Sequence, residues 1–158
     1  MAAQTAERVY RGYRRCSRID YADSAIAFEV TICVKPRRKA FVTTDRNTML
    51  IAELQRIQDE GAWGVYAYCV MPDHVHLIVN PGPNGLACAV RLFKGRIATW
   101  WRRSGDGQPL WQTSFFDHRI RSCEGFKDKC EYVFQNPVRA GLVARAKDYP
   151  WSGSLVRR

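Results

Sequence analysis

Short runs of apolar residues divide the 158-residue chain into segments typical of strands and segments typical of helices. Four runs rich in β-branched and aromatic residues, each bounded by turn residues, predict strands over 25–34, 64–71, 74–80 and 114–122. Only Pro72 and Asp73 separate the second run from the third, and such a short turn predicts a hairpin.

Three other segments carry apolar residues at the three- and four-residue spacing of an amphipathic helix, over 47–60, 86–101 and 124–136. In the first of them Leu50, Leu54 and Ile57 line one face, and the glycine that follows provides a C-terminal stop. Pro137 directly follows the third segment. We expect it to end that helix, because proline lacks the backbone N–H.

The predicted order of elements is β, α, β, β, α, β, α. This order favours one antiparallel sheet over a parallel doubly wound fold, so we expect an α+β, ferredoxin-like arrangement with helices packed on one face. A chain of this length that is 46% apolar can bury one core, and we expect a single domain over 1–158. Residues 1–20 are basic, and we expect them to form a flexible N-terminal segment.

The balance of charge points to an anionic partner. The chain has 25 Lys and Arg against 15 Asp and Glu, a net charge of +10, which predicts binding to nucleic acid. An ordinary solvated basic surface would give the same total. No apolar run approaches the roughly 18 residues that cross a bilayer, and the start MAAQTAERVYRGYRR lacks the apolar segment of a secretory signal. We therefore expect a cytoplasmic, nucleoid-associated protein with no membrane partner.

Basic residues cluster with aromatic residues in two parts of the chain. Arginines bind phosphates and nearby rings stack on unpaired bases, which makes these clusters candidates for DNA contacts. The candidates are Arg11, Arg14 and Arg15 near the N-terminus, and Arg91, Lys94, Arg102 and Arg103 around Trp100 and Trp101.

Two of the three histidines, His74 and His76, lie one residue apart at the start of a predicted strand. Side chains at this spacing point to the same face, where two neutral imidazoles can chelate a divalent cation. Two polar residues on the solvent face of a hairpin would give the same pattern. A metal site therefore requires a third ligand.

The predicted helix over 124–136 carries a polar group of residues on the face away from its apolar stripe. Tyr132 lies roughly 145° from the middle of that stripe, with Lys129 one turn before it and Asn136 one turn after it. This combination of hydroxyl, ammonium and amide suggests a site. An exposed helix face with an unimportant tyrosine is the alternative.

Four segments resemble a known family in order and spacing. They are YCVMPDHVHLIV (68–79), LWQTSFFDHRIR (110–121), YVFQNPVRAGLV (132–143) and DYPWSG (148–153). Together they resemble the REP-associated tyrosine transposases, which belong to the HUH single-tyrosine, IS200-like transposases. The resemblance implies that His74 and His76 bind a metal on a central strand of a ferredoxin-like palm, and that Tyr132 is the nucleophile. It also implies Asn136 as the third ligand, with the neighbouring Gln135 as the other possibility.

The resemblance further implies a divalent metal, Mg²⁺ or Mn²⁺, and single-stranded DNA that folds into hairpins at repetitive palindromes. Cleavage in the family gives a 5′-phosphotyrosine link and a free 3′-hydroxyl. A free tyrosine is a poor nucleophile at neutral pH, so we expect the metal and Lys129 to help form the phenolate. His118 is expected to be structural or close to the substrate. The family leaves both a monomer and a homodimer open.

Two other functions fit part of the pattern. A domesticated DNA-binding protein could keep the fold and cleave little, although the intact His74, His76 and Tyr132 weigh against this. An RNA-binding ferredoxin-like module would explain the charge but requires neither the histidine pair nor the tyrosine.

Overall fold

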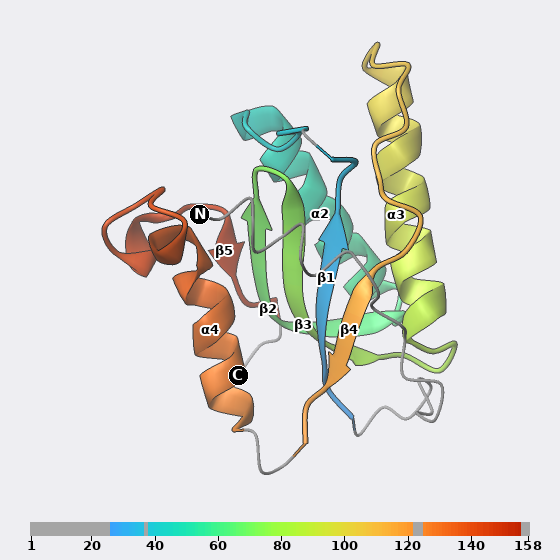
Figure 1. Ribbon diagram of the computed structural model, residues 1–158. Helices are drawn as coiled ribbons and strands as arrows, with labels where there is room; N and C mark the ends of the chain where they lie inside the picture. Colours follow the sequence, from blue (N-terminus) through green and yellow to red (C-terminus); the bar gives the residue numbers. More distant parts are fainter. Residues whose placement is uncertain (1–25, 37, 122–124, 156–158) are drawn as a thin grey trace.

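The centre of the molecule is a five-stranded antiparallel sheet with the strand order β4-β1-β3-β2-β5 (Figure 1). The computed structural model describes residues 26–36, 38–121 and 125–155. The strands are β1 (Phe28–Cys33), β2 (Trp63–Met71), β3 (His74–Pro81), β4 (Phe116–Arg119) and β5 (Ser152–Gly153). The four predicted strands are confirmed, and β5 is a two-residue addition that pairs with β2.

In the described part of the chain, three α-helices and one 3₁₀ turn connect or follow the strands. They are α2 (Thr44–Asp59), α3 (Leu86–Arg103), α4 (Phe126–Arg139) and η2 (Ala146–Asp148). The order of the main elements agrees with the sequence, so the predicted α+β class with an antiparallel sheet is confirmed. No helix in the described part of the chain is long and apolar enough to cross a membrane.

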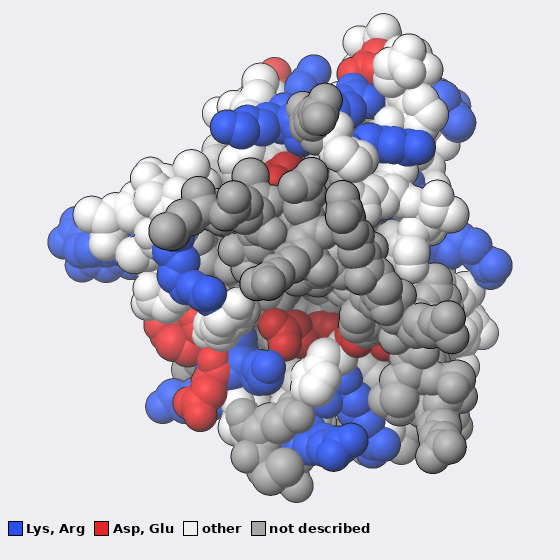
Figure 2. All heavy atoms as spheres, viewed as in Figure 1, with Lys and Arg blue, Asp and Glu red and all other residues white. Residues whose placement is uncertain are grey.

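Charged side chains are unevenly spread over the described surface. Figure 2 shows Lys and Arg gathered at the upper end of the view, where α3 ends, and along the margins of this face. The predicted flexible segment 1–20 and its DNA-contact candidates Arg11, Arg14 and Arg15 lie outside the described residues.

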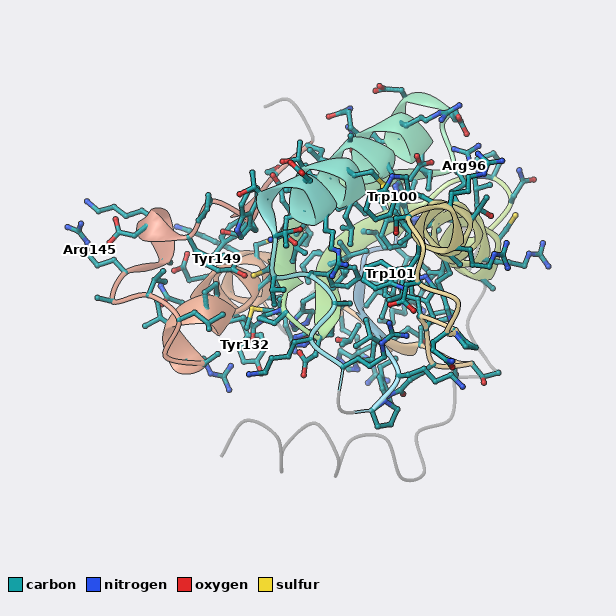
Figure 3. The ribbon with its side chains drawn as sticks, turned by 90° about the horizontal axis from the view of Figure 1, so that it is seen from above. Arg96, Trp100, Trp101, Tyr132, Arg145 and Tyr149 are labelled. Atoms are coloured by element: carbon teal, nitrogen blue, oxygen red, sulfur yellow. The ribbon has the colours of Figure 1, made fainter. Side chains whose placement is uncertain are left out.

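The helices cover both faces of the sheet, which differs from the expectation of one face. One core cluster joins Val30 and Leu77 of the sheet to buried residues of α2 and α3. The opposite face carries a second cluster in which Cys69 and Ile78 pack against Val133 of α4. Figure 3 accordingly shows Tyr132 on one side of the sheet and Trp100 on the other. Because β2 is apolar on both faces and β3 adds Ile78 to the face that α4 covers, both faces require cover.

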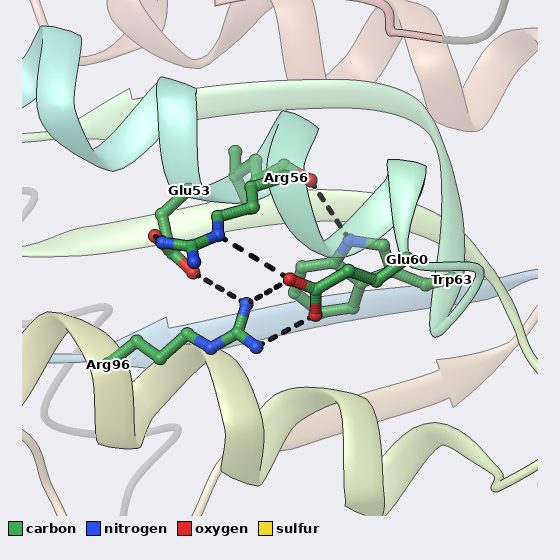
Figure 4. A network of polar contacts seen from close by, with 6 residues as sticks. Glu53, Arg56, Glu60, Trp63 and Arg96 are labelled. Carbon is green, nitrogen blue, oxygen red and sulfur yellow. Dashed lines mark hydrogen bonds and ion pairs between the residues drawn. The ribbon is translucent and has the colours of Figure 1, made fainter.

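Ion pairs fasten α2 to α3 on their shared face (Figure 4). Arg96 of α3 donates to Glu53 at 2.9 Å and to Glu60 at 2.7 and 3.1 Å, and Arg56 approaches the same two carboxylates. Trp63 at the start of β2 donates its indole N–H to the Leu54 carbonyl oxygen. These contacts fix the two helices against each other and against the sheet.

The third helix, α4, continues through Pro137, so the prediction that this proline ends the helix is wrong. Pro137 lies in the last turn, where its missing N–H removes one hydrogen bond of the helix, and its ring is buried. Helical bonding continues beyond the proline, since the Ala140 N–H donates to the Asn136 carbonyl. The helix ends before Gly141, which has a positive φ of 72°. Asn136 and Arg139 are therefore helical and lie one and two turns after Tyr132.

Candidate functional site

The two histidines lie at the beginning of β3 on the sheet face that α4 covers. His76 lies opposite Thr31 of β1, and His74 lies opposite Cys33. Their ring centroids are 6.4 Å apart, and His76 is only 6% exposed. The prediction that both imidazoles share a face is confirmed.

Asn136 reaches the histidine pair from α4. Its amide Nδ2 lies 2.7 Å from Nδ1 of His76. Gln135 instead donates to Glu131 at 2.8 Å on the exposed side of the same helix. Of the two amides considered from the sequence, the structure brings only Asn136 to the histidines.

Tyr132 lies beside the same imidazole. Its ring centroid is 5.9 Å from that of His76 in an edge-on arrangement of 80°, and the residue is 43% exposed. The guanidinium of Arg139 lies over the tyrosine ring, with Cζ 4.3 Å from the centroid. The predicted nucleophile is thus accessible, next to a histidine, and stacked against a permanent cation.

Each histidine also has a carboxylate partner that the sequence analysis did not identify. Glu29 of β1 accepts from Nε2 of His76 at 3.0 Å, and Asp73 lies 2.7 Å from Nδ1 of His74. The second oxygen of Glu29 accepts from the ammonium of Lys129 at 3.0 Å. A single charged residue inside the apolar run AIAFEVTICV was the available signal for Glu29.

Burial and these hydrogen bonds decide which of the histidines and carboxylates in the site carry a charge. Burial lowers the pKa of His76 by more than Glu29 raises it, which favours a neutral imidazole at neutral pH. Burial alone would raise the pKa of Glu29, but hydrogen bonds and charge from His76 and Lys129 lower it to about 2. The hydrogen bond to His74 lowers the pKa of Asp73. Both carboxylates are therefore ionised at neutral pH.

Lys129 and His118, both predicted to support the site, lie in different surroundings. The ammonium of Lys129 is bound to Glu29, so its charge is directed toward the sheet and the histidines. His118 of β4 lies opposite Glu29 in the register between β4 and β1, is exposed, and shares the face of the site. His118 thus lies on the face of the candidate site, and its expected role, structural or close to the substrate, stays a prediction.

The basic residues predicted on α3 lie on the other side of the sheet from this site. Arg91, Arg102 and Arg103 are exposed there. Lys94 donates to three backbone carbonyls, those of Gln112, Thr113 and Ser114, which indicates a structural role. Trp101 is 1% exposed and covered by Arg38 and Arg46, so its ring belongs to the core and is not available to stack on a base.

The residues present fit a divalent cation. Among the described residues, no three His, Cys, Asp or Glu side chains form a metal site, so an amide oxygen has to complete the set. An imidazole that donates one N–H to a carboxylate presents its other nitrogen as a ligand, as metal-binding histidines do. The contacts of Asp73 and Glu29 leave Nε2 of His74 and Nδ1 of His76 as those nitrogens. The amide of Asn136 lies next to the second of them.

Fold and site together define a class of protein in which a tyrosine and a pair of histidines lie on one face of an antiparallel sheet. Comparison with known families agrees: the family described as Transposase IS200 like matches residues 23–134. The chain therefore belongs to the IS200-like transposase family. The matched range contains both histidines and Tyr132 and ends two residues before Asn136.

Individual relatives carry related names. A Haemophilus influenzae protein named "Putative REP-associated tyrosine transposase" is 27% identical over 89% of this chain and 83% of its own length. The REP-associated tyrosine transposase of Escherichia coli K12 is 25% identical over 77% of this chain and 72% of its own length. A solved structure of a REP-associated tyrosine transposase bound to a REP hairpin has a similar fold. Its TM-score is 0.71 at 20% identity, over 90% of this chain and 94% of that chain.

Proposed function

We propose that this protein is a metal-dependent endonuclease and strand transferase for single-stranded DNA, with Tyr132 as the nucleophile. The phenol oxygen attacks a phosphodiester phosphorus and loses its proton, the bond from phosphorus to O3′ breaks, and the leaving oxygen takes a proton. A 5′-phosphotyrosine link and a free 3′-hydroxyl result. One observation carries the proposal: Tyr132 and Asn136, one helical turn apart, both lie against the imidazole of His76.

His74, His76 and Asn136 would hold the divalent cation, Mg²⁺ or Mn²⁺. When bound, the cation would neutralise charge on the scissile phosphate and help to orient it. The chain prepares this site because Asp73 and Glu29 each hold one imidazole through a ring nitrogen. Removal of the metal with EDTA is therefore expected to abolish cleavage.

We assign to Arg139 the stabilisation of negative charge at the nucleophile. Its guanidinium lies over the ring of Tyr132, where it stabilises negative charge that develops on the phenol oxygen and the phosphate. A guanidinium has five N–H donors in a planar fork, and this geometry suits a phosphodiester. No carboxylate in the described part of the chain forms an ion pair with Arg139, so phosphate is a suitable partner.

The substrate we propose is DNA that folds into hairpins at repetitive palindromes. Family membership, the net charge of +10 and the relative that was solved with a REP hairpin support this choice. The described basic residues at the end of α3 and the arginines near the N-terminus are proposed to contact the backbone. The protein would act as a monomer or homodimer at the nucleoid.

The deciding experiment is a search for a covalent adduct. The protein is incubated with labelled single-stranded hairpins that carry the repetitive palindromes of its genome, with Mg²⁺, Mn²⁺ or EDTA, and analysed on denaturing gels. We expect an adduct that requires the metal and is absent in Tyr132→Phe, while Tyr149→Phe still forms it. Tyr149 is the matched control because its hydroxyl donates to the Val70 carbonyl in the interior.

The same experiment separates the other two functions considered from the sequence. Retarded DNA without an adduct under any metal would contradict cleavage and identify a DNA-binding protein. Preference for RNA of the same hairpin sequence, again without an adduct, would identify an RNA-binding module.

A further inference from the structure

Glu29 is unusual among the residues of β1. Its neighbours along the strand, Phe28 and Val30, are fully buried in the apolar core on the other face of the sheet. The side chain of Glu29 is only 16% exposed, yet both of its oxygens have partners. One accepts from Nε2 of His76 and the other from Nζ of Lys129, each at 3.0 Å.

The contact with His76 is not the one that strand pairing alone would produce. In the register of β1 and β3, Glu29 lies directly opposite Ile78, whereas His76 lies opposite Thr31. Glu29 therefore reaches diagonally to the histidine, a distance that a long side chain can span. The diagonal contact leaves Nδ1 of His76 on the side of Asn136.

We propose that Glu29 is a positioning residue that fixes the tautomer and ring orientation of His76 for metal binding. A neutral imidazole has one N–H, and an ionised carboxylate at Nε2 holds the proton there. Nδ1 then carries the lone pair and faces the amide of Asn136. This inference rests on the proposed function, because it assigns the ligand nitrogen of the same metal site.

Lys129 extends the role of Glu29 to the helix that carries the nucleophile. It lies on α4, three residues before Tyr132, and its ammonium binds the oxygen of Glu29 that His76 does not use. One carboxylate on β1 thus holds a ligand histidine of β3 and the helix that supplies Tyr132 and Asn136. Glu29 therefore sets the distance between the metal ligand His76 and the nucleophile Tyr132.

The first test measures the tautomer in the metal-free protein by long-range ¹H–¹⁵N NMR of the His76 ring. We expect the Nε2–H form in the wild type and a mixture of tautomers in Glu29→Ala. Glu29→Gln should keep the Nε2–H form, because the glutamine amide oxygen still accepts a hydrogen bond from Nε2. This variant also keeps the test decisive if Glu29→Ala does not fold. Glu131→Gln is the matched control, since Glu131 lies exposed on α4 and its carboxylate accepts from Gln135 on the outer side of the helix.

The second test measures Mn²⁺ affinity by electron paramagnetic resonance of the free ion. Loss of an outer partner of a ligand histidine typically weakens metal binding 10- to 100-fold, and we expect a fall of about this size in Glu29→Ala. Glu29→Gln should lose less Mn²⁺ affinity than Glu29→Ala, and the affinity of Glu131→Gln should equal that of the wild type. Lys129→Met removes the contact between Glu29 and α4, so it should keep the tautomer and slow adduct formation on saturating DNA.

Three results would overturn the assignment. The first is an Nδ1–H tautomer in the wild type. The second is unchanged tautomer and Mn²⁺ affinity in Glu29→Ala. The third is complete loss of Mn²⁺ binding in Glu29→Gln with an unchanged tautomer, which would make Glu29 a ligand itself. A wild type that binds no Mn²⁺ would refute the proposed function, while the tautomer measurement would still decide the role of Glu29.

Discussion

At the scale of single residues, Asn136 and Gln135 are neighbours in sequence with different surroundings. The amide of Asn136 lies 2.7 Å from His76, whereas Gln135 bonds to Glu131 on the exposed surface. We expect Asn136→Ala to lower Mn²⁺ affinity and the rate of adduct formation by at least about tenfold, since loss of an outer partner alone costs that much. Gln135→Ala should leave both quantities unchanged. The opposite ranking, in Mn²⁺ titrations and single-turnover cleavage, would move the ligand role to Gln135.

The residues of the site differ in how far the sequence could predict them. His74, His76 and Tyr132 could be found because local periodicity places them on definite faces of a strand and a helix. The contact between Glu29 and His76 could not be predicted, because these residues are 47 positions apart and their diagonal contact depends on the register of β1 and β3. Arg139 was missed because the expected stop at Pro137 removed it from the helix of Tyr132.

At the scale of elements, α3 carries two adjacent tryptophans with different roles. Trp101 is 1% exposed and packs edge-on against Phe41, whereas Trp100 lies partly exposed beside an open groove between α2 and α3. We expect Trp101→Ala to lower the free energy of unfolding by about 3–5 kcal/mol, the usual cost of removing a buried large aromatic side chain. Trp100→Ala should cost less than half of that. Urea denaturation followed by circular dichroism measures both, and equal losses would contradict the assignment of Trp101 to the core.

Element boundaries and types followed from the sequence more closely than their arrangement. Periodicity located the main strands and helices because each repeats a short local pattern. Whether a helix covers one face of the sheet or the other depends on the connections between elements, and α4 lies on the face opposite α2 and α3. The two residues of β5 carry no periodicity of their own and are ordered by pairing with Tyr68 and Cys69.

At the scale of the whole molecule, the candidate site and the basic end of α3 lie at the same end of the sheet, on opposite faces. Phe41 links them, since its N–H donates to the carbonyl of Pro72, two residues before His74, and its ring packs against Trp101. Lys and Arg side chains gather at this end (Figure 2). A bound hairpin could therefore pass over the end of the sheet, with its cleavage site at Tyr132 and its stem near α3.

This geometry predicts that binding and cleavage can be separated. Joint replacement of Arg102 and Arg103 by alanine should weaken hairpin binding and flatten its salt dependence, by roughly 0.7–0.9 in log–log slope for each phosphate that the variant no longer neutralises. Cleavage at saturating DNA should not change, because both residues lie across the sheet from Tyr132.

Arg139→Ala should have the opposite effects on cleavage and binding. It should slow cleavage on the order of 10²-fold, the usual cost of losing one donor to developing charge, and change hairpin binding little. Salt-dependent fluorescence anisotropy and single-turnover assays measure the two quantities. Slower cleavage in the α3 variant at saturation would show that its arginines act at the reacting phosphate, and the path proposed for the DNA would be wrong.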